Sequence, residues 1–338
     1  MKAVGYQQSL PIDHPEALLD VTLPAPEAHG RDLLVEVRAV SVNPVDTKVR
    51  MRSQPAAGEW QVLGWDVAGV VRAVGDQVTA FRPGDRVWYA GAVDRPGANA
   101  ELHCVDERIV GRMPETLDFA AAAALPLTAI TAWELLFDRL GVVPGKQPRG
   151  ESLLVIGAGG GVGSILVQLA RRLTALTVVG TASRAETRQW VTELGAHHVI
   201  DHQQPLSAGL AGLGLQAVTH VASLTHTHQH FEGIIDALAP QGRLGLIDDP
   251  EPIDLRLLKK KSLSLHWEMM FTRSMFATDD MGAQGRLLDE VARMVDEGLV
   301  RSTLAGHFGA INASNLRRAH ALLESGKSRG KIVLEGFE

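Results

Sequence analysis

A run of small residues follows a short apolar segment near the middle of the 338-residue chain. The apolar segment ends at Ile156, and the next seven residues are GAGGGVG, in which Ala158, Gly160 and Gly163 match an A-x-G-x-x-G pattern. Small residues let the chain reverse tightly and approach a pyrophosphate, and a helix N-terminus supplies N–H groups and a partial positive charge. The turn is therefore predicted to bind a dinucleotide. The predicted contacts are Ala158, Gly159, Gly160, Gly161 and Val162.

The end of the next predicted strand distinguishes between the two nicotinamide dinucleotides. NAD-specific sites place Asp or Glu there, about 20 residues after the turn, to bind the ribose hydroxyls. This chain instead has Ser183 and Arg184, and the nearest carboxylate, Glu186, comes later. Arg184 could hold a 2′-phosphate with Ser183 as a hydrogen-bond partner, which favours NADPH. If Arg184 only faces solvent, the choice of cofactor stays open.

The elements around the turn alternate between strand and helix. Strands are predicted at 152–156, 177–181, 198–201, 218–223 and 243–247, and helices at 162–173, 187–194 and 230–238. This alternation predicts a doubly wound parallel sheet with helices on both faces.

The first 110 residues have a different pattern. Short strands at 33–39, 67–74 and 86–90 are separated by Gly/Pro turns, which is typical of a β-rich unit. Helices at 285–297 and 313–325 and a strand at 331–334 are predicted in the tail, which we expect to return to this unit. The predicted domains are 1–127 with 273–338, and 128–272.

The composition excludes several kinds of partner. The formal charge of −6, from 33 Lys and Arg against 39 Asp and Glu, gives no general attraction to nucleic acid or to anionic lipid. The single cysteine, Cys104, cannot form an intramolecular disulfide, which fits a reducing cytoplasm. The N-terminus lacks the pattern of a signal peptide. The apolar stretch 119–133 is broken by Pro126 and is shorter than the roughly 20 residues that span a bilayer, so we expect a soluble, cytoplasmic protein.

Several further segments, together with the glycine turn, resemble one family along nearly the full chain. They are SVNPVDTK at 41–48, GWDVAGVV at 64–71, VGD at 74–76, FRPGDRV at 81–87 and RPGANAE at 95–101. The chain resembles the medium-chain dehydrogenase/reductase superfamily, and within it the quinone oxidoreductase branch with its zinc-type alcohol dehydrogenase-like members. The resemblance implies an α/β protein that combines a GroES-like β-rich catalytic domain with a Rossmann nucleotide-binding domain.

The zinc ligands of that superfamily are replaced in this sequence. Asn43 stands where zinc enzymes have a Cys, Trp65 where they have the His of a Gly-His-Glu motif, and Leu127 near the third ligand. Catalytic zinc needs three Cys, His or carboxylate ligands, so no catalytic zinc is expected. The four cysteines of a structural zinc site are also absent.

One histidine cluster could still suggest a metal. His226, His228 and His230 alternate along the chain, and alternate residues face the same way only on a strand. Because they open a predicted helix, a polar loop near the cofactor is favoured over a metal site.

Reduction without a metal needs hydrogen-bond donors for the negative charge that develops on oxygen. The resemblance implies that Asn43 lies beside the nicotinamide and Thr131 near its carboxamide. Asp46 could relay a proton or could simply cap the turn after Pro44. Lys48 could neutralise Asp46 or point towards the cofactor.

A tyrosine that quinone reductases carry shortly after this turn is missing. The sequence contains only Tyr6 and Tyr89, and Tyr89 takes that role only if the fold brings it to the site. Trp65, Trp133 and Phe271, with Met270, could line a flat apolar pocket, although each also suits a core.

Two further residues, His202 and Lys331, are predicted to contact the cofactor. His202 occupies the place where relatives put an aromatic residue over the cofactor phosphate region, and Lys331 could close the site from the tail.

The leading hypothesis is a metal-independent, NADPH-dependent reductase of quinones or α,β-unsaturated carbonyl compounds. The alternatives are an alcohol dehydrogenase of the zinc-dependent type and a non-catalytic NADPH-binding protein. The segment 262–267 is a predicted edge strand, which favours a homodimer.

Overall fold

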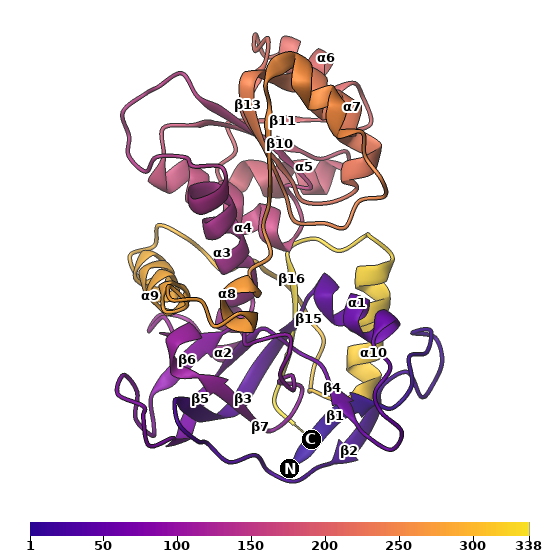
Figure 1. Cartoon of the computed structure of the whole chain (residues 1–338), viewed down its shortest axis with the longest axis vertical. Coiled ribbons are helices and arrows are strands. Elements are labelled where there is room, and N and C mark those ends of the chain that lie inside the picture. Colours follow the sequence, from indigo (N-terminus) through magenta and orange to yellow (C-terminus); the bar gives the residue numbers. More distant parts are fainter. Residues whose placement is uncertain (338) are drawn as a thin grey trace. The chain divides into compact units, whose positions relative to one another are not determined.

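The chain forms two units in the computed structural model, which describes residues 1–337 (Figure 1). Unit 1 consists of Met1–Ile130 and Phe271–Glu338, and unit 2 of Thr131–Met270. The sequence-based boundaries, after residues 127 and 272, lie within three residues of these positions. The chain therefore passes from one unit to the other twice.

Unit 1 is rich in β-structure, as the Gly/Pro-punctuated sequence indicates. Its strands are β1 (Lys2–Tyr6), β2 (Leu19–Thr22), β3 (Asp32–Val42), β4 (Gln61–Val62), β5 (Val67–Val74), β6 (Arg86–Tyr89), β7 (Leu102–Asp106), β8 (Val110–Arg112), β15 (Leu304–His307) and β16 (Lys331–Glu335). One sheet has the order β2-β1-β4, and a second has the order β15-β16-β3-β5-β6-β8 with β7 paired to β3.

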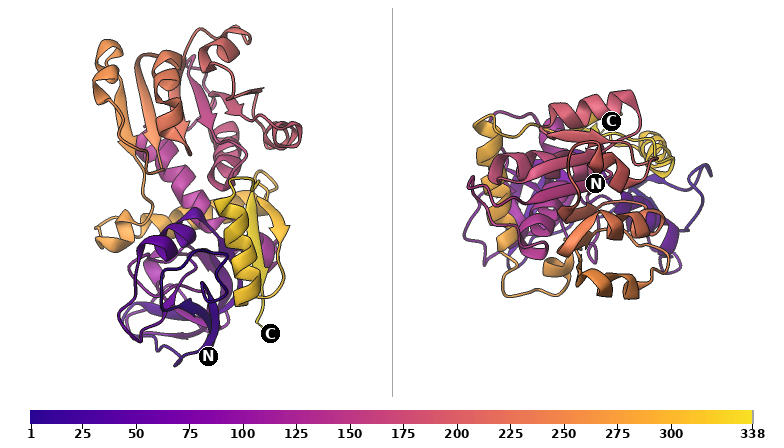
Figure 2. Two further views of the ribbon diagram at one scale, coloured as in Figure 1. Left: turned by 90° about the vertical axis from the view of Figure 1, so that its right-hand side faces the viewer. Right: turned by 90° about the horizontal axis from the view of Figure 1, so that it is seen from above.

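The central strands of the second sheet bring three distant segments to one edge. β16 and β5 both run antiparallel to β3, with Ile332 opposite Val42 and Val67 opposite Val40. The end of β3 therefore lies beside the starts of β5 and β16. Figure 2 shows the C-terminal segment, in yellow, beside the indigo N-terminal strands, so the tail returns to the first unit as expected.

The helices of unit 1 are α1 (Pro44–Arg52), α2 (Phe119–Ala123), α8 (Thr272–Met275), α9 (Ala283–Asp296) and α10 (Ala313–Glu324), with a 3₁₀ turn η1 (Glu107–Ile109). α1 and α10 lie side by side (Figure 1). Arg50 of α1 is fully buried and its guanidinium hydrogen-bonds Glu324 of α10. This contact fixes α1, which begins directly after β3.

Unit 2 contains a six-stranded parallel sheet. Its strands are β9 (Ser152–Ile156), β10 (Thr177–Thr181), β11 (His198–Ile200), β12 (Val218–Ser223), β13 (Leu238–Leu246) and β14 (Ser264–Trp267). Their order, β11-β10-β9-β12-β13-β14, reverses direction between β9 and β12, which is the doubly wound topology. A ligand site is expected at the carboxyl ends of the strands beside this reversal.

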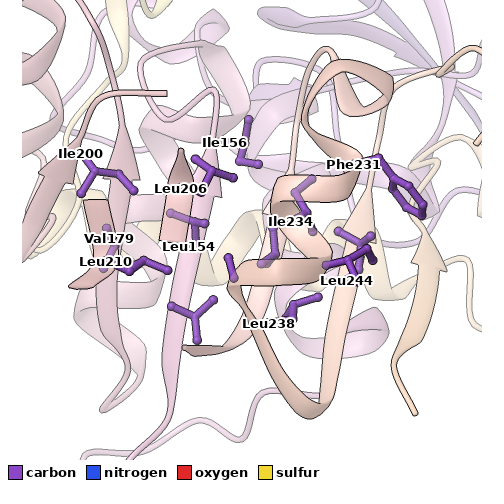
Figure 3. Close-up of a cluster of buried hydrophobic side chains, with 14 of the residues drawn as sticks. Leu154, Ile156, Val179, Ile200, Leu206, Leu210, Phe231, Ile234, Leu238 and Leu244 are labelled. Carbon is purple, nitrogen blue, oxygen red and sulfur yellow. The ribbon is translucent and has the colours of Figure 1, made fainter. Parts of the chain in front are cut away.

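The helices of unit 2 are α4 (Gly161–Leu173), α5 (Ala185–Glu193), α6 (Leu206–Ala211) and α7 (Thr227–Ala237), with a 3₁₀ helix η3 (Leu255–Lys261). Apolar residues from the strands and from α6 and α7 form a common core, including Leu154, Val179, Ile234 and Leu244 (Figure 3). The largest differences from the predicted boundaries in unit 2 concern α7 and β13. α7 starts three residues earlier than predicted. β13 starts at Leu238, and its register with β12 shifts before Arg243.

The apolar stretch that begins at Phe119 is longer than expected. α2 is followed by α3 (Pro126–Trp133), and a π-helical segment η2 (Glu134–Arg139) continues it. By length and composition alone, Phe119–Arg139 could cross a membrane, but most of it is buried inside the structure. Pro126 starts a helix here, where its missing N–H is not needed. The stretch has the character of a core helix.

Candidate functional site

The glycine turn joins β9 to α4 in unit 2. Gly157 has φ +80°, a left-handed conformation that favours glycine, and Gly160 donates its N–H to the Gly157 carbonyl at 3.1 Å. Gly160 caps α4, whose first N–H groups have no partner within the helix. The turn therefore has the features of an anion site at a helix N-terminus.

Two other glycines are required by close packing. A Cβ at Gly163 would lie 2.4 Å from the Gly157 carbonyl oxygen, and a Cβ at Gly159 would lie 2.2 Å from Thr187 Cγ2. No side chain fits at either place. The small residues of the predicted fingerprint thus allow the tight turn and the close approach of α4 and α5.

Arg184 and Ser183 follow β10, the strand next to β9. Arg184 is the N-cap residue of α5, its side chain is 45% exposed, and its guanidinium lies 3.9 Å from Glu186. The nearby Arg188 is instead directed inward, to the carbonyls of Ala182 and Val199 at 3.1 and 2.9 Å. β10 therefore ends without the Asp or Glu that binds the ribose hydroxyls in NAD-specific sites, and a partly exposed guanidinium follows it.

Two histidines of unit 2 are in aromatic contact. His202 and His230 meet edge to face with ring centroids 5.9 Å apart, and His226 is the left-handed N-cap residue of α7. Burial and the neighbouring His202, His226 and His228 lower the pKa of His230. Within the described residues 1–337, no three His, Cys, Asp or Glu side chains are grouped as metal ligands.

Asn43, Asp46, Asp66 and Lys331 form a buried group in unit 1, which we call the ionic cluster. Lys331 Nζ donates to Val42 O at 2.7 Å and to Asn43 Oδ1, and lies 3.1 Å from Asp66 Oδ2. These three contacts match the three N–H donors of an ammonium group. The side chains of Lys331 and Asp66 are only 3% and 0% exposed.

Backbone N–H groups hold the two carboxylates of the ionic cluster. Asp46 accepts from Asn43 N at 2.6 Å and from Gly64 N at 2.9 Å, and Asp66 accepts from Leu127 N at 3.1 Å. The Asn43 amide donates to Asp66 and to Ser41 O. Asp46 therefore caps α1, which is the simpler of its two predicted roles, and it also lies next to the only buried cation of the cluster.

Burial shifts the protonation of the ionic cluster. It raises the pKa of Asp46 to about 7, although the Asn43 N–H and the Lys331 charge act in the opposite direction. Burial also raises the pKa of Asp66 and lowers that of Lys331, while the attraction between the two opposes both shifts. Asp46 can therefore exchange a proton near neutral pH.

The donor set at this place does not fit zinc. The positions of the three expected ligands hold an amide, an indole and an aliphatic side chain, at Asn43, Trp65 and Leu127. Trp65 is fully buried, and its Nε1 donates to Ala92 O at 3.0 Å. The Lys331 ammonium supplies a positive charge among these residues, and a nearby divalent cation would face its repulsion.

The aromatic residues predicted to line a pocket lie in two separate contacts. In unit 1, Trp65 and Phe271 meet edge to face at 6.4 Å and both are buried. In unit 2, Trp133 meets Phe137 at 5.0 Å. Met270 is also buried.

Tyr89 is fully buried in unit 1. Its hydroxyl lies 3.0 Å from His103 Nδ1, and burial raises its pKa well above the usual value. The Tyr89 hydroxyl therefore contacts His103 and, within residues 1–337, forms no hydrogen bond with the ionic cluster.

Asp66 is the member of the ionic cluster that was not predicted from the sequence. Asp66 directly follows Trp65 in the segment that matches Gly-His-Glu, and this position could have identified it as the acidic partner. The charge that acts on Asp46 is that of Lys331, so the predicted neutralisation by Lys48 is not needed.

Lys331 lies within this cluster of unit 1, with its three donors directed at protein atoms. Thr131, at the start of unit 2, is buried on α3.

Comparisons with known proteins agree with this architecture. Two family models match, the alcohol dehydrogenase GroES-like domain at residues 29–122 and the zinc-binding dehydrogenase family at residues 194–334. A crystal structure of a protein from Rhizobium etli CFN 42, described as a zinc-dependent alcohol dehydrogenase protein, is similar to this chain. Its sequence is 59% identical and its TM-score is 0.96, and the match covers 100% of this chain and 98% of that one.

Curated relatives bear two kinds of name. A zinc-type alcohol dehydrogenase-like protein of Staphylococcus epidermidis (strain ATCC 12228 / FDA PCI 1200) is 35% identical over 338 residues, 99% of each chain. The quinone oxidoreductase of Mus musculus is 33% identical over 246 residues, 70% of each chain.

The first of these relatives matches both units from end to end. The fold combines a GroES-like unit with a nicotinamide-nucleotide-binding parallel sheet. The chain belongs to the medium-chain dehydrogenase/reductase superfamily of oxidoreductases.

Proposed function

We propose that the protein is a metal-independent reductase that transfers a hydride from NADPH to a quinone or an α,β-unsaturated carbonyl compound. The observation that supports it most directly is the ionic cluster, in which Lys331 and Asp66 pair among the positions where related enzymes hold zinc. A resident ammonium provides a fixed positive charge but no open coordination position for an alcohol.

The glycine turn and Arg184 support NADPH as the cofactor. In this proposal, Ala158 to Val162 hold the pyrophosphate, and Ser183 and Arg184 bind the 2′-phosphate. His202, which follows β11, is proposed to lie over the phosphate region of the cofactor. When bound, the nicotinamide supplies two electrons as a hydride.

Asn43, Asp46 and Thr131 are the proposed catalytic residues of this chain. Hydride addition leaves a negative charge on the acceptor oxygen, which amide and hydroxyl donors stabilise. Asn43 is held by Lys331, and one of its amide hydrogens must leave Ser41 or Asp66 to reach a substrate. Asp46, with its pKa near neutrality, supplies the proton that completes the reduction, directly or through water.

The apolar residues suit a flat acceptor. Trp65 and Phe271, which meet edge to face in unit 1, are the proposed apolar contacts of the acceptor. The mouse relative named quinone oxidoreductase supports this acceptor class.

A comparison of acceptors tests the proposal. Purified protein is treated with a chelator and assayed for NADPH oxidation with a quinone, an enone and an aldehyde, each also with NADH. Oxidation of NADPH by the quinone or the enone is expected, with NADH much less effective. NADPH binding without turnover on any acceptor would instead support a non-catalytic binding protein.

An alcohol dehydrogenase is the second candidate, because the Rhizobium etli and Staphylococcus epidermidis relatives have that name. It predicts alcohol oxidation that requires one tightly held zinc per chain. The donor set of the ionic cluster argues against it.

We also propose that the protein is a cytoplasmic homodimer. β14 pairs with β13 on one side, and within residues 1–337 no strand covers its other edge. Trp267 and Met269, at the end of this strand, are 51% and 50% exposed. A second copy of β14 would cover the edge and bury these side chains.

A further inference from the structure

Two buried glutamates of unit 2 lie close to the points where the chain enters and leaves this unit. Unit 2 starts at Thr131 and ends at Met270, and Glu134 and Glu268 are three and two residues inside these limits. They are 1% and 2% exposed. Glu268 directly follows β14, and its N–H continues the ladder to Leu246 O at 2.9 Å. The two chain connections thus meet at one pair of carboxyl groups.

Arg139 completes this group, which we call the carboxyl clamp. Its Nε donates to Glu268 Oε2 at 2.8 Å, and the Glu268 side chain is completely buried. The other oxygen, Oε1, is buried and receives no N–H group from residues 1–337. Burial raises the pKa of Glu268 to about 9, and the neighbouring Glu134 adds to this shift by its charge and by a side-chain hydrogen bond, while Arg139 opposes it.

The π-helical segment η2 explains how Glu134 and Arg139 face the same partner. In an α-helix, residues five positions apart point roughly 140° away from each other. In a helix closed by bonds between residues i and i+5, they lie nearly above one another. Leu140 N bonds Leu135 O at 2.9 Å in this pattern. The rare helical form therefore places both groups towards Glu268.

The surroundings of the carboxyl clamp leave little room for adjustment. A Cβ at Gly245 of β13 would lie 2.5 Å from Leu135, so strand and helix are in close contact. Arg243 of β13 donates to Leu140 O at 2.6 Å and caps the end of η2. The charged or titratable groups facing this region are Glu134 and Arg139 from η2, Arg243 from β13 and His266 from β14.

We propose that Glu134, Arg139 and Glu268 act as a positioning clamp in which the two carboxyl groups share one proton, fixing the spacing between η2 and the end of β14. Two buried carboxylates with one guanidinium would carry a net negative charge, whereas one shared proton makes the group neutral. Release of the proton therefore pushes η2 and β14 apart.

The clamp acts on cofactor binding through Thr131. This residue lies three positions before Glu134, one helical turn away on the same face. This step rests on the proposed function, in which Thr131 binds the nicotinamide end of NADPH. Loss of the shared proton is then expected to weaken NADPH binding while leaving the glycine turn unchanged.

The test compares Glu134→Gln with Glu134→Ala. An amide N–H can replace the shared proton permanently, so Glu134→Gln should keep its neutral-pH dissociation constant for NADPH into the alkaline range. In the wild type, this constant should rise by up to about tenfold per pH unit once the proton is lost. Glu134→Ala should bind NADPH more weakly at every pH. Glu232→Gln, an exposed glutamate of α7, is the matched control and should follow the wild type.

Binding is measured by NADPH fluorescence, and the melting temperature is recorded at each pH without cofactor. The wild type should melt at lower temperature as the pH rises, and Glu134→Gln should show a smaller fall. Parallel melting curves for these two proteins would overturn the shared proton, whatever the protein binds. A normal pH dependence of melting with no effect on NADPH binding would overturn the positioning role alone. If Glu134→Gln does not fold, Glu268→Gln replaces it. Absence of NADPH binding in the wild type would refute the proposed function, while the melting curves still test the shared proton.

Discussion

Removal of the Lys331 ammonium is the sharpest perturbation of the ionic cluster. Lys331→Met keeps most of the side-chain volume but deletes the charge and its contacts with Val42 O, Asn43 and Asp66. Asp66 then remains buried, with the donors Leu127 N and Asn43 Nδ2 but without an opposite charge next to it.

The expected cost follows from burial. Both side chains are almost completely buried, so solvent screening does not reduce the interaction appreciably. Breaking a buried ion pair by removing one partner costs about 3–5 kcal/mol, mostly because the remaining charge is left uncompensated. Replacing both charges is often much cheaper. We therefore expect Lys331→Met to lose about 3 kcal/mol or more, and Lys331→Met with Asp66→Asn to lose less than the single variant.

Urea unfolding at several pH values measures both effects. Loss of the cation raises the pKa of Asp66 in the folded state, so its carboxyl is neutral at acidic pH and the deficit should grow as the pH rises. A loss below about 1 kcal/mol, typical of an exposed pair, would refute the assignment of a buried pair. So would additive losses in the double variant.

Three further predictions concern separate parts of the protein. Arg184→Gln should raise KM for NADPH roughly tenfold with little change for NADH, because it removes a partly exposed charge-assisted bond; equal changes for both cofactors in steady-state kinetics would argue against 2′-phosphate binding. The raised pKa of Asp46 stabilises the fold fully below the unfolded value near 3.8, and this contribution is lost as the pH rises to about 7. Urea titrations of the wild type and Asp46→Asn should therefore differ in slope by about 1.4 kcal/mol per pH unit in this window, and parallel slopes would contradict the shift. Light scattering should give twice the mass of one chain, and Trp267→Asp should reduce it to a monomer; a monomeric wild type would refute the dimer.

Much of the fold could be predicted because its signals are local. The strands at 152–156, 177–181 and 218–223 coincide with β9, β10 and β12, since each is a compact apolar run between clear turns. The glycine turn was predictable because Gly163 has a steric role that no other residue can perform. β13 starts earlier than predicted, but its register with β12 shifts between Leu238 and Arg243 and Gln241 has φ +64°, so the turn composition around Gly242 marks an irregularity inside the strand.

The ionic cluster and the carboxyl clamp depend on contacts between distant residues. Lys331 meets Asn43 only because β16 pairs with β3 across nearly the whole length of the chain. From the sequence alone, Lys331 was therefore predicted as a contact of the cofactor, and its pairing with Asp66 was not foreseen. Glu134 and Glu268 gave no signal at all, because a π-helical turn and the end of a parallel strand are needed to bring them together. The sequence also grouped Trp65 with Trp133, but in the structure these two residues belong to different units.

The most direct test of the account is metal analysis together with activity on one preparation. Protein is dialysed against a strong chelator, its zinc content is determined, and NADPH oxidation by a quinone is followed before and after the treatment. We expect no stoichiometric zinc, unchanged activity after chelation, and little activity with NADH. One zinc per chain whose removal abolishes turnover, and whose return restores it, would contradict a metal-independent reaction.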